Sequence, residues 1–402
     1  MNPNINDQIP LETLVKTMLL FSDSMLKFNL FHVSTHTTTL HSTVTVYCCN
    51  DFSNLSVSVS KTKHHQDDSF TLSSIIKSSR LSPETSLKLS QRLKNRNSDD
   101  GPNAVIHLLR NYGFSASQLS SLVKKHPFVL LSKPEKTLLP KLNFLLSIGV
   151  SITDLPKILI WNTDLSTTSL DKNIIPLYQT IRSFVRNDKE VVSVLKQWTV
   201  NYYTDFMVPN IELLRNLGVP QRFISLLVSN FPNEAFIEHS RFVEAVNLVK
   251  EMGFDPLKAN FVFALLVIAR MDKETWELKL KIFERWGWSK DICLSAFQKD
   301  PRYMVTSEKK IMEIMSFLVN DMGFTPEDIA RWPAILNRSL EKTIVPRCTV
   351  IKILKSRGLI KSSLSLNSII ILNEKAFLER YVTRFEKDLP LLLDAYKGQN
   401  SD

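Results

Sequence analysis

Glycine is scarce in this chain, which has only nine glycines in 402 residues. The sequence contains no GxGxxG, P-loop, GxSxG or HExxH motif, so the common nucleotide-binding and hydrolase signatures are excluded. The paired carboxylates Asp67-Asp68 and Asp99-Asp100 lie in polar stretches that we interpret as solvated loops. We therefore expect no catalytic residues and no cofactor, and a protein that is not an enzyme.

Cysteines and long apolar runs are also few. The four cysteines form no CxxC pair and no disulfide framework, which favours a reducing compartment. Five histidines near Cys48 and Cys49 could ligate zinc, but their spacing fits no closed Cys/His module, and we expect no metal site. The longest apolar run, residues 261–269, is too short to span a bilayer, so we expect no membrane association.

Arginine is absent before Arg80, and residues 1–69 hold four Lys and six Asp or Glu. This segment is rich in Ser and Thr, has a single acidic residue between 25 and 66, and sustains no helical periodicity past Phe31. Such a leader is typical of an organelle transit peptide, although the missing Arg and the early acids disagree with that interpretation. We expect residues 1–69 to be a disordered leader that directs organelle import, with a disordered cytosolic tail as the alternative.

Seven of the nine glycines recur along the rest of the chain in steps of 36, 69, 35, 34, 36 and 35 residues. They are Gly113, Gly149, Gly218, Gly253, Gly287, Gly323 and Gly358. A period of about 35 residues with apolar helical patterning is typical of stacked helical repeats. The step of 69 equals two periods, so one copy near Asn187 has lost its glycine. We predict about seven repeats.

Each repeat is predicted to consist of a first helix, a proline turn and a last helix that ends at glycine. In one copy, Thr325 and Asp328 form a capping box around Pro326, and Trp332-Pro333 must end the helix. Gly358 then takes the left-handed position that follows the last helix. A single unit cannot bury its own apolar face, so the repeats must stack. Residues 70–398 are thus predicted to form an all-α superhelical solenoid.

The chain is basic, with a formal charge of +10. Outside residues 1–69 it carries 46 Lys or Arg against 34 Asp or Glu, which suits a polyanionic partner such as nucleic acid. Four cations recur nine residues after the turn prolines, at the start of the last helix; these helix-start cations are Lys136, Arg241, Lys310 and Lys342. Exposed N–H groups at a helix start together with a cation would form a phosphate site, with pairing to Glu135 and Glu341 as the alternative.

Further cations lie near the ends of the last helices. Arg215, Lys250 and Lys355 precede a closing glycine by three residues, where helix electrostatics alone can explain a cation. We refer to them as the helix-end cations. Arg347 and Lys352 add to the charge of the last repeat, which is the best single docking patch. The six tryptophans fall near repeat junctions, and we expect them to pack in the core and not to stack on bases.

Several stretches resemble the plant form of the mTERF family, the mitochondrial transcription termination factor-like proteins. The resemblance covers about Phe70 to Gly398 and is strongest at residues 81–84, 109–114, 133–140 and 339–347. It implies a superhelical array of short triple-helix motifs that binds double-stranded DNA in a basic concave groove and regulates organelle transcription, in termination or initiation. It also implies that Lys342 and Arg347 contact the nucleic-acid backbone.

Alternative functions follow from the same repeat architecture. Organelle RNA binding in processing or intron splicing belongs to the same class, and a protein-binding helical scaffold to a different one. A pentatricopeptide RNA reader would need a polar residue pair at fixed positions of each repeat, which we do not find. We expect a monomer located in mitochondria, with the chloroplast as the alternative.

Overall fold

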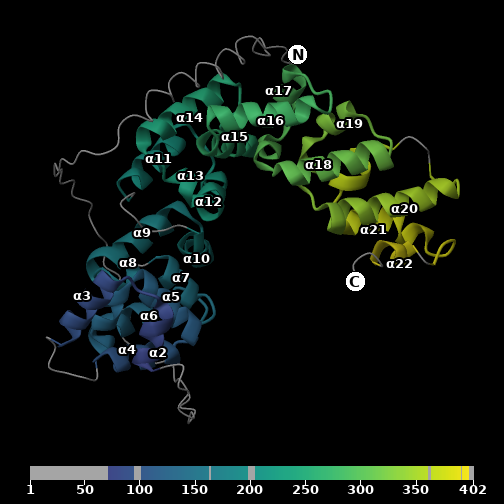
Figure 1. Ribbon diagram of the computed structural model, residues 1–402. Helices are drawn as coiled ribbons and strands as arrows, with labels where there is room; N and C mark the ends of the chain where they lie inside the picture. Colours follow the sequence, from purple (N-terminus) through teal and green to yellow (C-terminus); the bar gives the residue numbers. More distant parts are fainter. Residues whose placement is uncertain are drawn as a thin grey trace. The chain divides into compact units, whose positions relative to one another are not determined.

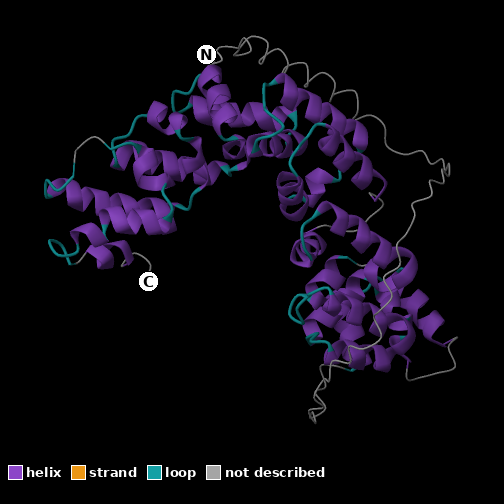
Figure 2. Cartoon of the chain, turned by 180° about the vertical axis from the view of Figure 1, so that it is seen from behind, coloured by secondary structure: helices purple, strands orange, loops and turns teal. Residues whose placement is uncertain are grey.

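The computed structural model describes residues 71–94, 101–162, 164–197, 204–360, 364–390 and 392–397. All regular structure in these ranges is helical, and they contain no strand, as Figure 2 shows. The predicted all-α class is confirmed. The predicted leader, residues 1–69, lies outside the described residues, and so does Trp198.

Seven successive repeats lie between Ala116 and Ser356, and most of them contain three helices, as the family resemblance implied, where the glycine and proline pattern predicted two. Figure 1 labels their α-helices. The first helices are α5 (Ala116–Lys125), α7 (Leu155–Trp161), α10 (Asp188–Gln197), α12 (Gln221–Asn230), α15 (Ala259–Arg270), α17 (Lys290–Lys299) and α19 (Pro326–Arg331). The predicted proline turns are short middle helices: η2 (Pro127–Leu131), α8 (Asp164–Thr167), α13 (Pro232–Ala235), η5 (Pro301–Val305) and η7 (Pro333–Asn337).

The last helices complete each repeat. They are η3 and α6 (Pro134–Leu138, Leu139–Ser147), η4 and α9 (Leu170–Ile174, Ile175–Phe184), α11 (Thr204–Asn216), α14 (His239–Glu251), α16 (Lys273–Glu284), α18 and η6 (Glu308–Ser316, Phe317–Asp321), and η8 and α20 (Leu340–Ile344, Val345–Ser356). In the fifth repeat α16 follows α15 after only two residues, so this repeat has no middle helix.

Additional helices flank the repeats at both ends. They are α2 (Leu72–Ser79), α3 (Pro83–Lys94) and α4 (Gly101–Asn111) before the first repeat, and η9 (Asn367–Ile371), α21 (Glu374–Tyr381), η10 (Thr383–Phe385) and α22 (Leu392–Lys397) after the last. On the N-terminal side α2 packs against α5, and on the C-terminal side α22 packs against α20. These helices cover the apolar faces that the terminal repeats would otherwise expose.

The glycines end the last helices in the predicted way. All seven have positive φ, between 69° and 93°, which is the left-handed region that favours glycine. At Gly358 the main-chain N–H donates to Lys355 O at 3.0 Å, and the N–H of Leu359 donates to Leu354 O at 3.0 Å. These bonds satisfy carbonyls at the end of α20, as a glycine cap requires.

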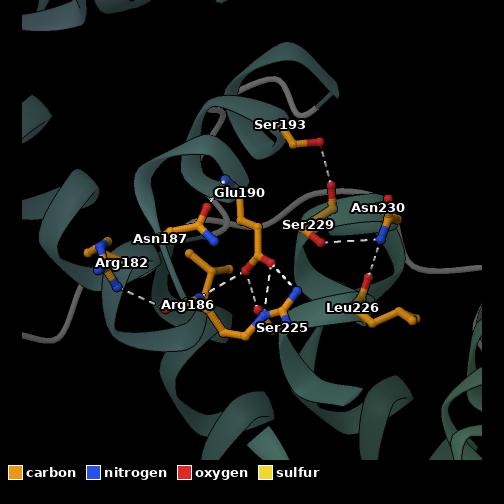
Figure 3. Close-up of polar contacts among 10 residues, drawn as sticks. Arg182, Arg186, Asn187, Glu190, Ser193, Ser225, Leu226, Ser229 and Asn230 are labelled. Atoms are coloured by element: carbon orange, nitrogen blue, oxygen red, sulfur yellow. Dashed lines mark hydrogen bonds and ion pairs between the residues drawn. The ribbon is translucent and has the colours of Figure 1, made fainter. Parts of the chain in front are cut away.

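The junction without a glycine is stabilised by a side-chain network around Glu190 (Figure 3). Here α9 is followed by an extended residue, Val185, and Asn187 accepts a hydrogen bond from the Glu190 N–H at 3.1 Å. The Glu190 carboxylate accepts the N–H of Arg186 at 2.9 Å and its guanidinium at 2.6 Å, and also the hydroxyl of Ser225. Because Ser225 lies on α12, the network joins the first helices of two neighbouring repeats.

Prolines inside the last helices explain why three of them begin with a π-helical turn. Pro140, Pro176 and Pro346 lie at the second position of the α-helical part, directly after η3, η4 and η8. A proline has no N–H to bond the carbonyl four residues earlier, and its ring crowds that carbonyl. The wider turn accommodates the ring while the helix continues.

Contacts divide the described residues into two units. One comprises residues up to 212 together with 224–236, and the other comprises 213–223 and the residues from 237 onward. Within each unit the middle helix of one repeat packs on the first helix of the repeat before it, as α13 does on α10 and η5 on α15. The middle helices therefore lie at the contact between successive repeats, and the residues beside them are placed by both.

Candidate nucleic-acid interface

The helix-start cations occupy one equivalent position, the third residue of the last helix. The structure adds Lys172, which follows the capping residue Ser169 by three residues in η4. Sequence analysis missed Lys172 because its repeat has Thr163, and no proline, nine residues earlier. The fifth repeat has Thr275 at this position. The signal that would have found Lys172 is the capping serine, which also precedes Lys310 and Lys342 by three residues.

Four of the helix-start cations present their charge to solvent. Lys136, Lys172, Arg241 and Lys342 are all exposed, and none of them pairs with a carboxylate among the described residues. Two of their main-chain amides are less available than predicted: the Lys172 N–H donates to Ser169 Oγ at 3.3 Å, and the Lys342 N–H donates to Ser339 Oγ at 3.1 Å. At Lys136 and Arg241 no side chain of the described residues caps the helix start. An anion at Lys172 or Lys342 would therefore meet the side-chain ammonium group and not the bare amide of that residue.

Lys310 differs from the other helix-start cations. It is half-buried, and its Nζ donates to the main-chain carbonyl of Asn337 at 3.0 Å, at the end of η7 in the following repeat. Its ammonium group therefore serves the contact between two repeats. We leave Lys310 out of the interface proposed below.

Arg347 was expected on the surface, but the structure buries it. Only 4% of the residue is exposed, and its Nη1 donates to the carbonyls of Ile369, Ile370 and Leu372 at 3.3, 2.9 and 2.6 Å. The guanidinium carbon lies 4.7 Å from the centroid of the Phe377 ring. The side chain thus connects α20 to η9 and α21, and its charge is not offered to a nucleic-acid backbone. The three carbonyls that accept from Nη1 offset part of the cost of burying this cation, whose Nε is buried without a hydrogen-bond partner in the described part of the chain.

Lys310 and Arg347 belong to a recurring set of contacts that we call repeat clamps. In each clamp a polar side chain of a last helix donates to a main-chain carbonyl at or just after the next short helix. The bonds are Lys141 Nζ to Ser166 O (2.7 Å), Asn210 Nδ2 to Ala235 O (3.1 Å), Lys279 Nζ to Thr306 O, Lys310 Nζ to Asn337 O, and Arg347 Nη1 to the carbonyls around Ile370. Burial lowers the pKa of Lys141 and of Lys279, which reflects the cost of placing an ammonium group there.

A second set of cations flanks the middle helices from the opposite side. These residues end the first helices and are exposed; we call them the turn cations, and they are Lys125, Lys299 and Arg331. Arg331 also pairs with Asp328 at 3.1 Å. A cation at a helix C-terminus is favoured by the helix dipole. Because each middle helix is at most five residues long, the turn cations and the helix-start cations lie at the same edge of the repeats. The sequence signal that we overlooked is a cation two residues before a turn proline.

The helix-end cations lie at the other end of the last helices. The carbonyls of Arg215, Lys250 and Lys355 accept the N–H of the closing glycine at 2.9, 2.9 and 3.0 Å. We call the edge of the repeats where the helix-start cations lie the helix-start edge. A 13-residue helix is roughly 20 Å long, so the structure does not bring the helix-end cations to the helix-start edge. Lys352 is exposed one turn before the end of α20 and belongs to the same end.

The tryptophans divide between core and surface. Trp288 is 2% exposed, stacks on Phe283 at 4.7 Å, and donates its Nε1–H to Pro326 O at 3.0 Å, which confirms the expected core role for this residue. Trp161 and Trp332 are 61% and 39% exposed, so the prediction of core packing is wrong for these two. Both stand at the end of a first helix, beside the turn.

A cavity of about 690 Å³ lies next to α16, in the repeat that has no middle helix. Its wall includes Trp276, Leu280 and the buried Cys293. Burial raises the pKa of the Cys293 thiol to about 12, so almost no thiolate forms near neutral pH and the sulfur is a weak nucleophile.

Among the described residues no group of three or more His, Cys, Asp or Glu could hold a metal ion. None of the helices in those residues has the length and apolar character that a membrane span needs.

Comparison with known proteins gives several relatives with consistent names. The chain is 20% identical over 267 residues to "Transcription termination factor MTERF8, chloroplastic" of Arabidopsis thaliana, covering 64% of this chain and 51% of the relative. It is 22% identical over 283 residues to "Transcription termination factor MTERF15, mitochondrial" of the same plant, covering 70% and 55%. The chain thus spans about half the length of the curated relatives it matches.

A family model gives the stronger result. The model for mTERF matches residues 106–318 and 267–378, and together these matches extend over more than half of the chain. The matched region contains the repeats, the closing glycines and the helix-start edge described above. The chain therefore belongs to the mTERF family.

Proposed function

We propose that this protein is a non-catalytic, monomeric nucleic-acid-binding protein that binds double-stranded DNA and regulates transcription in an organelle. The observation that carries the proposal is the helix-start position, where Lys136 and Lys172 in one unit and Arg241 and Lys342 in the other are exposed at equivalent positions of their repeats. A phosphate backbone is a regular polyanion, and cations that recur at one position of several repeats are suited to it. The turn cations add positive charge beside the same middle helices.

The names of the relatives support the organelle and the transcriptional role. Each relative reported above is called a transcription termination factor, one chloroplastic and one mitochondrial. We propose the mitochondrion, with the chloroplast as the alternative, and residues 1–69 as the import signal. A fluorescent reporter fused to residues 1–69 tests this: a reporter that stays in the cytosol contradicts it.

Salt dependence of binding tests the interface itself. The four exposed helix-start cations are replaced together by alanine, and the affinity for a random-sequence duplex is measured between roughly 50 and 200 mM salt. Each lost phosphate contact removes about 0.9 from the slope of log K against log salt, so the slope should flatten by about 3 to 4. Sequence preference should survive, because phosphate contacts carry no base information.

A matched control separates this effect from net charge. Four other exposed lysines, at the opposite end of the repeat helices and two in each unit, are replaced by alanine: Lys157, Lys189 and Lys290 in the first turns of α7, α10 and α17, and Lys352 near the end of α20. This variant loses the same formal charge but should retain most of the slope. If the two variants behave alike and circular dichroism shows both folded, the helix-start edge is not the interface. If the wild-type protein prefers structured RNA over the duplex, the alternative of organelle RNA processing is favoured.

A further inference from the structure

Trp161 is a surface residue in a position that other repeats fill with cations. It ends α7, as Lys125 ends α5, Arg270 ends α15, Lys299 ends α17 and Arg331 ends α19. All four of those cations are exposed, so the position does not require an apolar side chain for packing. Trp161 is itself 61% exposed. The indole is therefore not explained by the core.

Basic and aromatic groups alternate around this residue. The Lys125 Nζ lies 4.6 Å from the centroid of the Trp161 ring, and the guanidinium carbon of Arg92 lies 4.5 Å from the centroid of Phe128. Lys125 and Phe128 are three residues apart, at the end of α5 and the start of η2, so the two pairs are neighbours. Arg92 and Lys125 are exposed and Phe128 is half-buried. All of these residues lie in one unit.

We infer that Trp161, flanked by Lys125, forms a stacking site for an unpaired base, so that this unit binds a single-stranded segment of nucleic acid. Every base has a π face, and an exposed indole beside a cation is an arrangement that binds single strands without sequence readout. In duplex DNA the faces of the bases are covered by their neighbours, so a duplex gives the indole little to stack on. The inference rests on the proposed function and adds, beside the cations proposed to bind the duplex, a separate site for an unpaired strand.

The test uses the full chain and three fluorescein-labelled probes: a 15-nucleotide oligo-dT, a 15-nucleotide oligo-rU and a 20-base-pair duplex. Trp161→Leu removes the aromatic ring but keeps an apolar side chain, and Trp161→Phe retains a smaller ring. Leu257→Ala is the control, because Leu257 is similarly exposed, at 60%, and lies in the other unit. Binding is measured by fluorescence anisotropy.

Trp161→Leu should weaken binding of the single strands roughly 5- to 30-fold, as expected for the loss of one base–aromatic stack. Trp161→Phe should recover much of that loss, and Leu257→Ala should bind like the wild type. Duplex affinity should change less than about twofold, and the salt slope should stay the same because no charge is removed. A loss confined to oligo-dT or to oligo-rU would assign the site to DNA or to RNA.

Two results overturn the inference while leaving the proposed function intact. In the first, the wild-type protein binds the duplex but neither single strand. In the second, Trp161→Leu binds the single strands as tightly as the wild type, or loses affinity for the duplex equally. If the wild type binds none of the three probes, the proposed function fails and the stacking site fails with it.

Discussion

The Nζ atom of Lys310 lies 3.0 Å from the main-chain oxygen of Asn337, in the repeat that follows its own. Lys342 occupies the equivalent helical position one repeat later and is exposed. Each lysine follows its own capping serine by three residues and its turn proline by nine, yet the two have different roles. Lys310 connects two repeats, and Lys342 faces solvent. This pair gives the most direct way to separate the structural cations from the proposed binding cations.

Replacing Lys310 by Met should lower the free energy of unfolding by about 1–3 kcal/mol, because the Asn337 carbonyl loses a charged donor. Lys342→Met should change it by less than about 0.5 kcal/mol, since an exposed side chain is removed. The order reverses for binding: Lys342→Met should reduce the salt slope by about 0.9 and Lys310→Met should leave it unchanged. Urea denaturation and salt titration measure the two effects. A stable Lys310→Met variant with a reduced slope would place Lys310 among the binding cations.

Arg347 should behave as a structural residue. Arg347→Met leaves the carbonyls of Ile369, Ile370 and Leu372 without their common donor, and we expect a loss of about 2–3 kcal/mol in unfolding free energy. Lys352→Met is the control, because Lys352 lies on the same helix and is exposed. If Arg347→Met retains wild-type stability and loses DNA affinity, Arg347 contacts the nucleic-acid backbone, as the family resemblance implied.

The sequence allowed the boundaries of the repeats to be predicted, because glycine and proline act through local backbone geometry. Gly323 can adopt the positive φ that follows a helix, and Pro333 fixes φ and lacks an N–H donor, whatever surrounds them; both end helices where predicted. The roles of Arg347 and Trp161 depend on neighbours 22 to 36 residues away, in the flanking helix after the last repeat and in the previous repeat. No local pattern carries that information, so a buried arginine was predicted at the surface and an exposed tryptophan in the core.

The closing glycines should differ in how much they tolerate alanine. A Cβ at Gly323 meets nothing within 4 Å, so Gly323→Ala bears only the backbone cost of positive φ, about 1–2 kcal/mol. A Cβ at Gly113 would lie 2.6 Å from Ile152 Cγ2, so Gly113→Ala should lose more stability. The double variant Gly113→Ala/Ile152→Ala should recover the difference. Thermal denaturation of the three variants compares these costs; equal losses for the two single variants would exclude the predicted clash.

Glu190 should make stability depend on pH on the acidic side. Burial raises the pKa of this carboxyl, but hydrogen bonds from Ser225 and from the amide and guanidinium of Arg186 outweigh burial, and the net pKa lies below its ordinary value of 4.5. The unfolded chain therefore takes up the proton more readily than the folded one. Stabilisation by the carboxylate is complete above about pH 4.5 and is lost as the pH falls through the lower, folded pKa.

Glu190→Gln removes that titration while keeping the size of the side chain. We expect the variant to be less stable than the wild type near pH 7, because an amide cannot replace the ion pair with Arg186. The difference in unfolding free energy between the two proteins should narrow as the pH falls below about 4.5. The wild type then loses the stabilisation by the Glu190 carboxylate, which the variant lacks at every pH. Other carboxyls with lowered pKa values, such as that of Asp154, are present in both proteins and cancel in the difference. Urea denaturation at several pH values between about 7 and 3 measures this difference, with Glu84→Gln as a control for an exposed helical ion pair. If the difference in unfolding free energy stays constant over this range, ionisation of Glu190 does not contribute to the stability of the repeat junction.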